Sequence, residues 1–572
     1  MTGDPGRTVN LIFDLLQRAP GAVEAFDVCV VGAGPAGITL ATELIGSGLK
    51  VCLVESGGLD DEPEAQALNV GESIGLPARI DTGRHRVFGG SATRWGGRCA
   101  ALDRIDFEPR DWIHKSGWPI TFDHLQPFYE RAKRSSNLSD DWISDEAALQ
   151  KLGIEPPNLD AENVAPFVWR IARRDKGRSL SSLTKLGYRE AFDWGVTYRR
   201  QLETDANTTV ILHANLTDFQ VSSDGAVVEA ITVATLTGRK NTIRARAFVL
   251  CCGGIENARL LLNGPAALLD RVNEFDNLGR YLGQHPRGTV ATVDANLRTA
   301  RRLQRTFNHF LRPERAGTQY EVGFALSEQA QRTHGLVNAS AAVYYDAPPL
   351  SPWKAAKRLR AAALQRAPYS GMARDALQLA SGIGEVSVNS TRRVLLGRQI
   401  VHGRPTIKIE VDLEQEPNPD SRVMLSTQLD ALGLKQAKID WRISPIERRT
   451  ARFFCAFLVK EFTRLELGTV RPTDWLENID GDKGLWGNYH FIGATRMSED
   501  PRQGVVDPDC RAHGVANLYF AGSSVFPTGG HANPTFTIVA LAIRLADHLR
   551  AKVTSVSTAE TPASRPMASA AP

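Results

Sequence analysis

The chain has 572 residues, 42% hydrophobic and 23% charged, which is the composition of a globular protein rather than a disordered or fibrous one. Its formal net charge of +4 is too small to indicate a nucleic-acid partner, and no apolar stretch reaches the length of about 18 residues that a membrane-spanning helix needs. Seven cysteines without a CxxC pair, and no visible secretory leader, predict a reduced, cytoplasmic protein without a metal site.

The chain begins with an N-terminal extension, residues 1–25, which contains one short amphipathic segment, Val9–Gln17. The next residues change character, with an apolar run at Asp27–Val31, a glycine-rich turn, a helical stretch at 38–47 and a second apolar run at 50–54. This order of strand, turn, helix and strand is typical of a Rossmann-like nucleotide-binding unit.

The turn reads Gly32-Ala33-Gly34-Pro35-Ala36-Gly37, and Glu55 closes the second strand. Gly32 makes the tight turn, Gly34 lets the backbone approach a pyrophosphate, Gly37 allows close helix–strand packing, and Glu55 can accept the ribose hydroxyls. A lone GxGxxG is weak evidence, but here the flanking strand, helix and acid are all present. The sequence therefore predicts a dinucleotide site, although the spacing alone does not separate FAD from NAD.

Short alternating runs over residues 209–252 predict a strand meander, and Val249–Leu262 passes from a buried strand through Gly253–Gly254 into a helix. Residues 291–400 are Arg-rich and the least informative part of the chain. A basic helical stretch there, Trp353–Arg366, is either a solvated face or lid, or a surface facing a membrane or a partner.

Near the C-terminus, Asn517–Ala521 has the pattern of a strand. Asn533 can cap a helix, Pro534 suits the first helical position, and Phe536–Leu549 carries an apolar helical pattern. The residues that follow contain few large apolar side chains, so we expect a disordered tail over 553–572.

Three ordered segments together resemble one family: Gly32–Gly37, the loop Val87–Gly97, and a C-terminal block from His490–Met497 through Asn517–Gly522 to Gly529–Thr535. They resemble the glucose–methanol–choline (GMC) oxidoreductases, and within them the subgroup of pyranose 2-oxidase and the bacterial fructose and gluconate dehydrogenase flavoprotein subunits. This resemblance implies an FAD-dependent enzyme that oxidises alcohols by hydride transfer to flavin N5.

The resemblance assigns the catalytic histidine to His490 and its partner to Asn533. The chemistry agrees, because a neutral imidazole suits removal of a hydroxyl proton and an uncharged amide can donate to the developing alkoxide. His531 remains a rival base and a candidate substrate contact, together with Asn488 and Phe491, whereas His285 and His513 are expected to be structural.

The residues that the resemblance places at the cofactor are many. They are Gly32, Gly34, Gly37, Glu55, Gly89, Gly90, Ser91, Arg94, Trp95, Gly96, Gly253, Gly522, Ser523, Asn533, Pro534 and Thr535. Leu212 or Ala214 is a further candidate at the adenine.

Two departures from the subgroup pattern bear on the chemistry. Arg94 stands where the oxidase carries the histidine that binds FAD covalently, so the sequence predicts non-covalent FAD. Gly96 replaces a threonine close to the flavin, which puts direct use of oxygen in doubt and leaves O2 or a quinone-like carrier as the acceptor.

The expected fold is α/β: a Rossmann-like FAD-binding domain of GMC type with an interleaved substrate domain on a mixed or antiparallel sheet. We expect residues 26–118, 196–290 and 485–552 to form the FAD domain, and 119–195 and 291–484 the substrate domain. The expected reaction is oxidation of a hydroxyl group of a sugar, glycoside or related polyol to the carbonyl. The alternatives are a non-sugar alcohol, the flavoprotein subunit of a multi-component dehydrogenase, or a silent flavin-binding protein. A homo-oligomer is possible.

Overall fold

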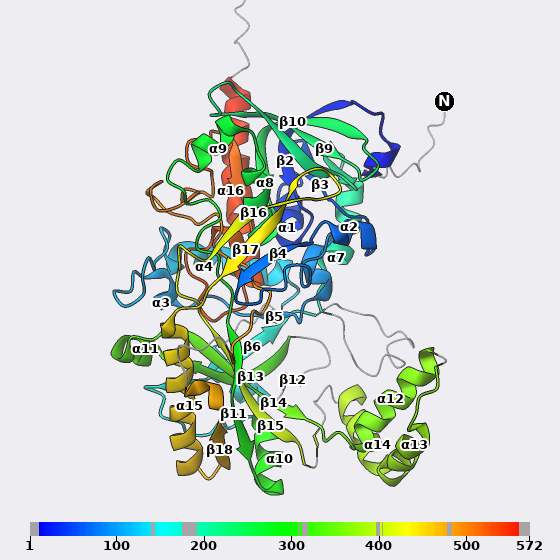
Figure 1. The fold of residues 1–572 in the computed structure, drawn as a ribbon, viewed down its shortest axis with the longest axis vertical. Coiled ribbons are helices and arrows are strands. Elements are labelled where there is room, and N and C mark those ends of the chain that lie inside the picture. Colours follow the sequence, from blue (N-terminus) through cyan, green and yellow to red (C-terminus); the bar gives the residue numbers. More distant parts are fainter. Residues whose placement is uncertain are drawn as a thin grey trace, which may run out of the picture.

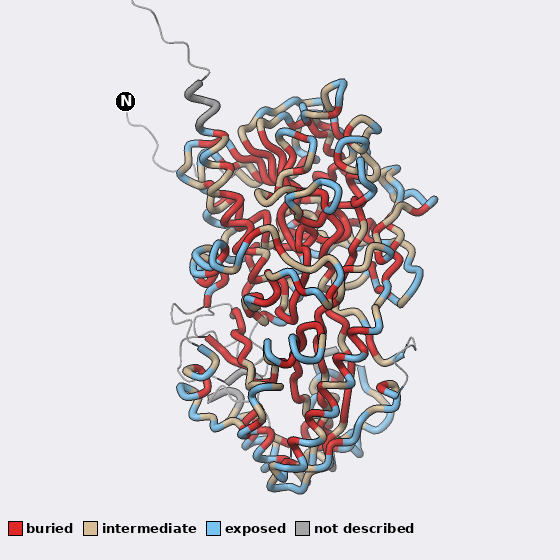
Figure 2. The backbone as a smooth tube through the Cα atoms, turned by 90° about the vertical axis from the view of Figure 1, so that its left-hand side faces the viewer, coloured by how far each residue is buried: buried red, intermediate tan, exposed pale blue. Residues whose placement is uncertain are grey.

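The computed structural model describes residues 11–138, 144–173, 191–307, 309–311, 318–365, 367–395, 401–402, 404–477 and 483–559. Two eight-stranded sheets dominate this part of the chain, one in the upper and one in the lower half of Figure 1. Figure 2 shows buried backbone at the centre of both halves and exposed backbone mainly at their rims. The candidate site lies between the two halves.

The upper sheet has the order β1 (Ile12–Asp14), β7 (Thr208–Leu212), β3 (Val51–Val54), β2 (Val23–Val31), β10 (Lys240–Leu250), β9 (Val228–Ala234) and β8 (Asn215–Val221). From β1 to β10 all neighbours are parallel, and β19 (Leu518–Phe520) also pairs with β10 in parallel. The β8–β9–β10 meander is antiparallel. Parallel strands need a cover on both faces, and the buried run Val28–Val31 is apolar for this reason.

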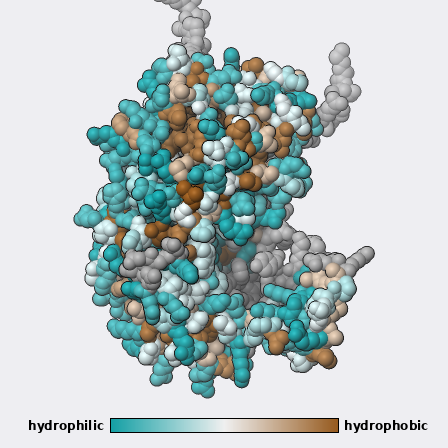
Figure 3. Space-filling model, in the orientation of Figure 1, coloured by the Kyte–Doolittle hydropathy of each residue, from teal (hydrophilic) through white to brown (hydrophobic). Residues whose placement is uncertain are grey.

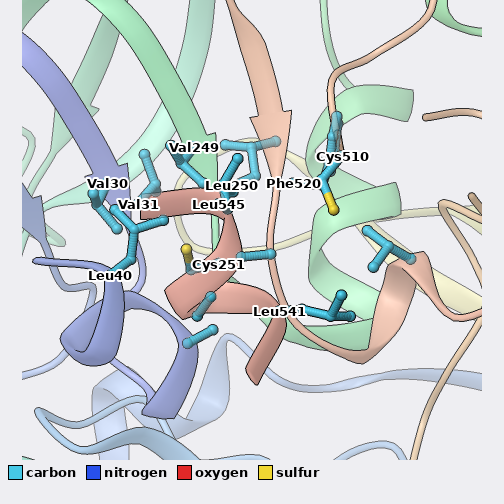
Figure 4. Packing of buried hydrophobic residues seen from close by; sticks show 14 of the residues in the cluster. Val30, Val31, Leu40, Val249, Leu250, Cys251, Cys510, Phe520, Leu541 and Leu545 are labelled. Carbon is cyan, nitrogen blue, oxygen red and sulfur yellow. The ribbon is translucent and has the colours of Figure 1, made fainter. Parts of the chain in front are cut away.

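Helices cover this sheet. They are α1 (Pro35–Glu43), α4 (Phe122–Ser135), α7 (Trp194–Thr204), α8 (Gly253–Leu262), α9 (Ala266–Val272) and α16 (Thr535–Ala559). Helix α1 packs against α16 and α7, and α16 packs against α4. Figure 4 shows Leu541 and Leu545 of α16 beside the apolar strand residues Val249, Leu250 and Phe520.

The lower sheet has the order β18 (Thr469–Pro472), β11 (Arg287–Asp294), β15 (Thr406–Leu413), β14 (Ala339–Asp346), β13 (Gln319–Leu326), β6 (Val164–Ile171) and β5 (Arg98–Cys99), with β12 (His309–Leu311) beside β13. Every pairing in it is antiparallel. The long helix α15 (Pro445–Arg464) packs on β11, β15 and β18, and it buries Phe454, Leu458 and Phe462 in a second core.

A small third sheet joins distant parts of the chain. Its strands are β16 (Arg422–Leu429), β17 (Lys435–Trp441) and β4 (Gly71–Gly75), with β17 parallel to β4. The shorter elements are η1 (Leu15–Gln17), α2 (Pro63–Ala67), η2 (Gly90–Arg94), α3 (Arg104–Phe107), α5 (Asp145–Leu152), α10 (Leu297–Thr306), α11 (Glu328–His334), η3 (Asp474–Leu476) and η4 (Ser523–Val525).

Helices α12 (Pro352–Gln365), α13 (Met372–Ser381) and α14 (Ile383–Leu395) form a separate group that projects from the lower half. The predicted basic helix, Trp353–Arg366, corresponds to α12. The face drawn in Figure 3 is mainly hydrophilic, with hydrophobic residues gathered in its upper half. No helix within the described residues has the length and apolar character needed to cross a bilayer.

The expected α/β architecture is confirmed, with a mixed upper sheet and an antiparallel lower one. The predicted strand meander and the helix after Pro534 are also confirmed, whereas α1 ends at Glu43 rather than at residue 47. Two predicted segments are wrong at their edges. Residues 12–14 of the expected extension pair with β7, and β2 begins at Val23.

The expected tail boundary is also wrong, because α16 continues to Ala559. Val553 is buried, and adding residues to an established helix costs much less than starting one, so the last turns form despite their composition. Residues 560–572 lie outside the described part of the chain.

Candidate active site

One elongated cavity of about 810 Å³ lies between the two sheets. One end is formed by the β2–α1 turn and the end of β3, the other by the segment Asn488–Phe491 and by Asn533. Strands β5, β11, β13 and β14 of the lower sheet contribute side chains to the second end. A ligand that fills this cavity therefore contacts both halves of the molecule.

The first end suits a pyrophosphate. Gly34 is the N-cap of α1 and has no capping side chain, so the backbone N–H groups of the first turn are available to an anion. A Cβ on Gly90 would lie 2.7 Å from the Cα of Gly34, so only glycine lets these two backbones approach. This cradle fits the phosphates of a dinucleotide.

Glu55 follows β3 and is buried at the wall of the cavity. Its carboxylate accepts hydrogen bonds from the backbone N–H of Ala33 at 2.8 Å and of Gly57 at 2.9 Å. Burial raises the pKa of this carboxyl, while the two hydrogen bonds oppose the rise. The oxygens keep lone pairs that a ribose hydroxyl can use.

Most residues predicted to contact the cofactor line the cavity. They are Gly32, Gly34, Glu55, Gly90, Ser91, Arg94, Trp95, Gly96, Gly253, Gly522, Ser523, Asn533, Pro534 and Thr535, and Ala214 lines it as well. Gly37 and Gly89 do not line it. They are packing positions, since a Cβ on Gly37 would lie 1.9 Å from the carbonyl oxygen of Gly32, and Gly89 has a φ of +107°.

His490 and Asn533 meet at the second end. Asn533 Nδ2 lies 3.5 Å from His490 Nε2, and His490 Nδ1 lies 3.1 Å from Nδ1 of His285. Burial holds the pKa of His490 well below its usual range, and His285, Arg287 and Arg98 lower it further, while Asp412 opposes them. The imidazole of His490 is therefore neutral at pH 7, as a proton acceptor must be.

Of the three predicted substrate contacts, Asn488 and Phe491 line the cavity and His531 does not. His531 is buried behind it, 3.4 Å from Asp103 and edge-on to Phe167. Residues two apart share a face only in an extended strand, and the bends between Gly529 and Pro534 break that relation with Asn533. His531 thus does not line the cavity in this structure, and its contact with the substrate stays a prediction.

A belt of charged side chains beside His490 was not predicted from the sequence. Arg98 donates to Glu321 at 2.8 Å and to the Tyr344 hydroxyl at 2.9 Å, and Arg287 donates to Asp412 at 2.7 and 2.6 Å. We call Arg98, Glu321, Arg287 and Asp412 the charged belt. Its members come from four strands far apart in sequence, so no local pattern indicated them.

A second unpredicted cluster lines the first half of the cavity. Glu256, in the first turn of α8, contacts Arg86 at 2.9 Å and Arg259 at 2.6 Å, and Arg84 lies 3.5 Å away. These three arginines keep the pKa of Glu256 far below its usual range although the carboxyl is buried. The only sequence feature near it was the glycine pair before α8.

The fold and this cavity fit a dinucleotide-dependent enzyme whose cofactor site opens on a histidine and an amide. Residues 25–71 match the family described as FAD binding domain, and residues 417–542 match the family described as GMC oxidoreductase. The second match and the relatives below make the chain similar to the GMC oxidoreductases, and they support an FAD-dependent enzyme acting on CH–OH donors.

Two relatives align with most of the chain, and a third with a short segment of it. The chain is 26% identical to 6'''-hydroxyparomomycin C oxidase of Streptomyces lividus and 24% identical to paromamine 6'-oxidase of Streptomyces fradiae, each alignment covering 93% of both chains. It is 43% identical to the C-glycoside 3-oxidase of Arthrobacter globiformis over 12% of this chain and 13% of that one. Formate oxidase shares the fold, with a TM-score of 0.55 at 16% identity over 94% of this chain and 100% of that one.

Proposed function

We propose that this protein oxidises a hydroxyl group of a sugar, glycoside or related polyol to the carbonyl. The observation that carries the proposal is the neutral His490 beside Asn533 at the end of a cavity that fits a dinucleotide. Bound FAD, held by the glycines at the β2–α1 turn and by Glu55, supplies the acceptor for the hydride. The chain itself supplies the proton acceptor and the groups that orient the alcohol.

His490 takes the hydroxyl proton on Nε2. As the O–H bond breaks, the electron pair of the C–H bond leaves as a hydride, and the carbon–oxygen bond becomes a carbonyl. Asn533 donates from Nδ2 to the oxygen while negative charge develops on it, without altering the charge of the site. The alcohol thus loses one proton and one hydride, and His490 returns its proton to solvent after the carbonyl leaves.

The charged belt supports a polyhydroxylated substrate. Arg98, Arg287 and Glu321 line the cavity, and the two arginines are paired with Glu321 and Asp412, so the belt presents donors and acceptors but no uncompensated charge. A neutral ring with several hydroxyls matches such a surface better than an aliphatic or aromatic alcohol does. Asn488 lines the same end of the cavity and adds an amide.

A second candidate is a hydroxyl of an amino sugar. The two relatives that align over 93% of this chain are named for aminoglycoside substrates, and Glu321 offers a carboxylate at the cavity wall. A polycation would have to compete with Arg98 for that carboxylate, which favours the neutral sugar. We keep the similarity to the subgroup of pyranose 2-oxidase and the bacterial fructose and gluconate dehydrogenase flavoproteins as a proposal, which a partial match to a fructose dehydrogenase large subunit supports.

We propose non-covalent FAD, because Arg94 at the cavity wall is paired with Asp61 and a guanidinium forms no histidyl bond to flavin. The acceptor that reoxidises it is O2 or a quinone-like carrier.

The seven cysteines are all unpaired, which supports a reducing compartment such as the cytoplasm. A multi-component dehydrogenase is the remaining alternative, and a partner subunit would show in the mass of the purified complex.

The test is anaerobic mixing of the FAD-loaded protein with neutral sugars, glycosides, aminoglycosides and simple alcohols, followed by flavin absorbance. We expect bleaching by at least one neutral sugar or glycoside, and His490→Ala should slow that bleaching by at least about a hundredfold. His513→Ala is the matched control, since the His513 ring contacts the backbone carbonyl of Ser498 and lies outside the cavity. Bleaching by His490→Ala at the wild-type rate would refute the proposal.

A further inference from the structure

We propose that His285 is a positioning residue that fixes the tautomer of His490, so that the lone pair on Nε2 faces the cavity. The inference deepens the proposed function and rests on it for the role of His490 as the base. His285 does not line the cavity, and its side chain is buried. It acts through His490 only.

A backbone carbonyl fixes the position of the hydrogen on the His285 ring. His285 Nε2 lies 3.3 Å from the carbonyl oxygen of Gly529, which can only accept a hydrogen bond. Nε2 of His285 therefore carries the hydrogen. In a neutral imidazole one ring nitrogen is the donor and the other the acceptor, so Nδ1 of His285 holds a lone pair.

The lone pair on His285 Nδ1 in turn fixes the tautomer of His490. His285 Nδ1 and His490 Nδ1 are 3.1 Å apart, and two lone pairs facing one another would repel. His490 must therefore donate from Nδ1, which leaves the lone pair of its neutral ring on Nε2. The amide of Asn533 lies 3.5 Å from that atom, and its N–H groups are donors. The hydrogen bonds that link Gly529, His285, His490 and Asn533 are therefore consistent with only one assignment of donors and acceptors.

This series of hydrogen bonds requires both imidazoles to be neutral before the alcohol binds. The charged or titratable groups that face His490 are His285, Asp412, Arg287 and Arg98, and those that face His285 are His490, Asp412 and His531. Burial is the largest influence on both rings and lowers the pKa of each. When His490 takes the substrate proton, its Nδ1–H becomes a charge-assisted donor to His285, so the same contact stabilises the product of proton transfer.

Hydrogen bonds between the two backbone segments hold the imidazoles of His285 and His490 next to one another. Gly283 and Ile492 exchange hydrogen bonds of 3.0 and 2.9 Å, and the backbone N–H of Tyr489 donates to the Gln284 side chain at 3.1 Å. The imidazoles meet edge to face, with centroids 5.1 Å apart. The segment that carries His490 is therefore tied to the segment that carries His285 on both sides of the pair.

The experiment compares His285→Asn with His285→Leu. Asparagine keeps an oxygen acceptor near the position of Nδ1, whereas leucine fills the space without an acceptor. His513→Asn is the matched control. We expect the leucine variant to reduce its flavin at least about tenfold more slowly at saturating substrate, with substrate affinity unchanged within about threefold. The asparagine variant should stay within about threefold of the wild type. FAD content and melting temperature, measured on every variant, identify any that misfold.

A second readout needs no substrate. Ring NMR of histidine-labelled protein, with His490 assigned by its absence in His490→Ala, should show the hydrogen of His490 on Nδ1 in the wild type and in His285→Asn. It should move toward Nε2 in His285→Leu. A wild-type His490 protonated on Nε2, or a leucine variant as fast as the wild type, overturns the inference. If no alcohol reduces the wild-type flavin, the proposed function fails while the NMR result still decides the tautomer.

Discussion

The position of His490 in a buried, partly cationic setting determines how the reaction should depend on pH. Its pKa lies below the ordinary histidine value, and in the proposed mechanism His490 accepts a proton only when its ring is neutral. We expect the rate constant of flavin reduction to be constant near pH 7 to 8 and to fall as the pH drops through a pKa below about 6.5. Stopped-flow absorbance at saturating substrate measures it. A midpoint above 7 would contradict the environment described for His490.

Arg110 and Glu414 form an ion pair whose side chains are fully buried, with Arg110 Nη1 and Nη2 donating at 2.8 and 2.5 Å. Breaking such a pair leaves the buried Arg110 with only a longer contact of 4.0 Å to the Asp106 carboxylate. We expect Glu414→Gln to lower the free energy of unfolding by about 3–5 kcal/mol. Urea unfolding measures the loss. The control is Asp123→Asn, which breaks the exposed Arg104–Asp123 pair and should leave the midpoint unchanged. Equal midpoints for Glu414→Gln and the wild type would exclude a structural role.

Several residue roles were within reach of the sequence and others were not. His490 and Asn533 lie in a contiguous block, and the glycines of the first turn follow a fixed spacing, so their places at the cavity were predictable, while the catalytic roles of His490 and Asn533 stay proposals. The charged belt was not, because Arg98, Glu321, Arg287 and Asp412 meet only through strand pairings across hundreds of residues. His285 was expected to be merely structural, since nothing local in the sequence shows that it would meet His490.

The packing of α1 on β2 depends on Gly37. A Cβ there would lie 1.9 Å from the carbonyl oxygen of Gly32, a backbone atom that cannot move without moving the turn. We therefore expect Gly37→Ala to lose at least about tenfold in FAD affinity and to lower the melting temperature. FAD titration followed by flavin fluorescence measures the first effect. Gly384→Ala is the control, because Gly384 has open space around its Cβ position and lies in α14. Unchanged FAD binding by Gly37→Ala would show that the turn tolerates displacement.

Element type was predictable where the pattern is strong, as in β2, α1, β10 and α16. The sheet that each strand joins could not be predicted. Strand β4 pairs with β17, more than 360 residues later, and β1 joins the edge of the upper sheet although its composition shows only a short amphipathic segment. Pairing partners of this kind are decided by long-range packing, which local sequence does not encode.

At the scale of the whole molecule, the cofactor should act as a structural bridge, since its cavity is lined by both sheets. If FAD is non-covalent, acid precipitation should leave the yellow colour in the supernatant, and the apoprotein should melt at a lower temperature than the holoprotein. A free cofactor concentration of 100 times its Kd contributes about 2.7 kcal/mol. Re-addition of FAD to neutralised, refolded protein should restore the melting temperature. A yellow pellet would show a covalent bond.

The upper sheet places β10 between β2, near the start of the chain, and β19, nearly 500 residues later. Asn533 and the first turn of α16 follow directly and complete the cavity wall. During synthesis, a nascent chain that has emerged only as far as residue 480 already exposes the phosphate-binding turn, but it has neither the base nor the last strand beside β10. Loading with cofactor and the onset of chemistry therefore both wait for the last sixth of the polypeptide, so a truncated translation product should carry no active flavin centre.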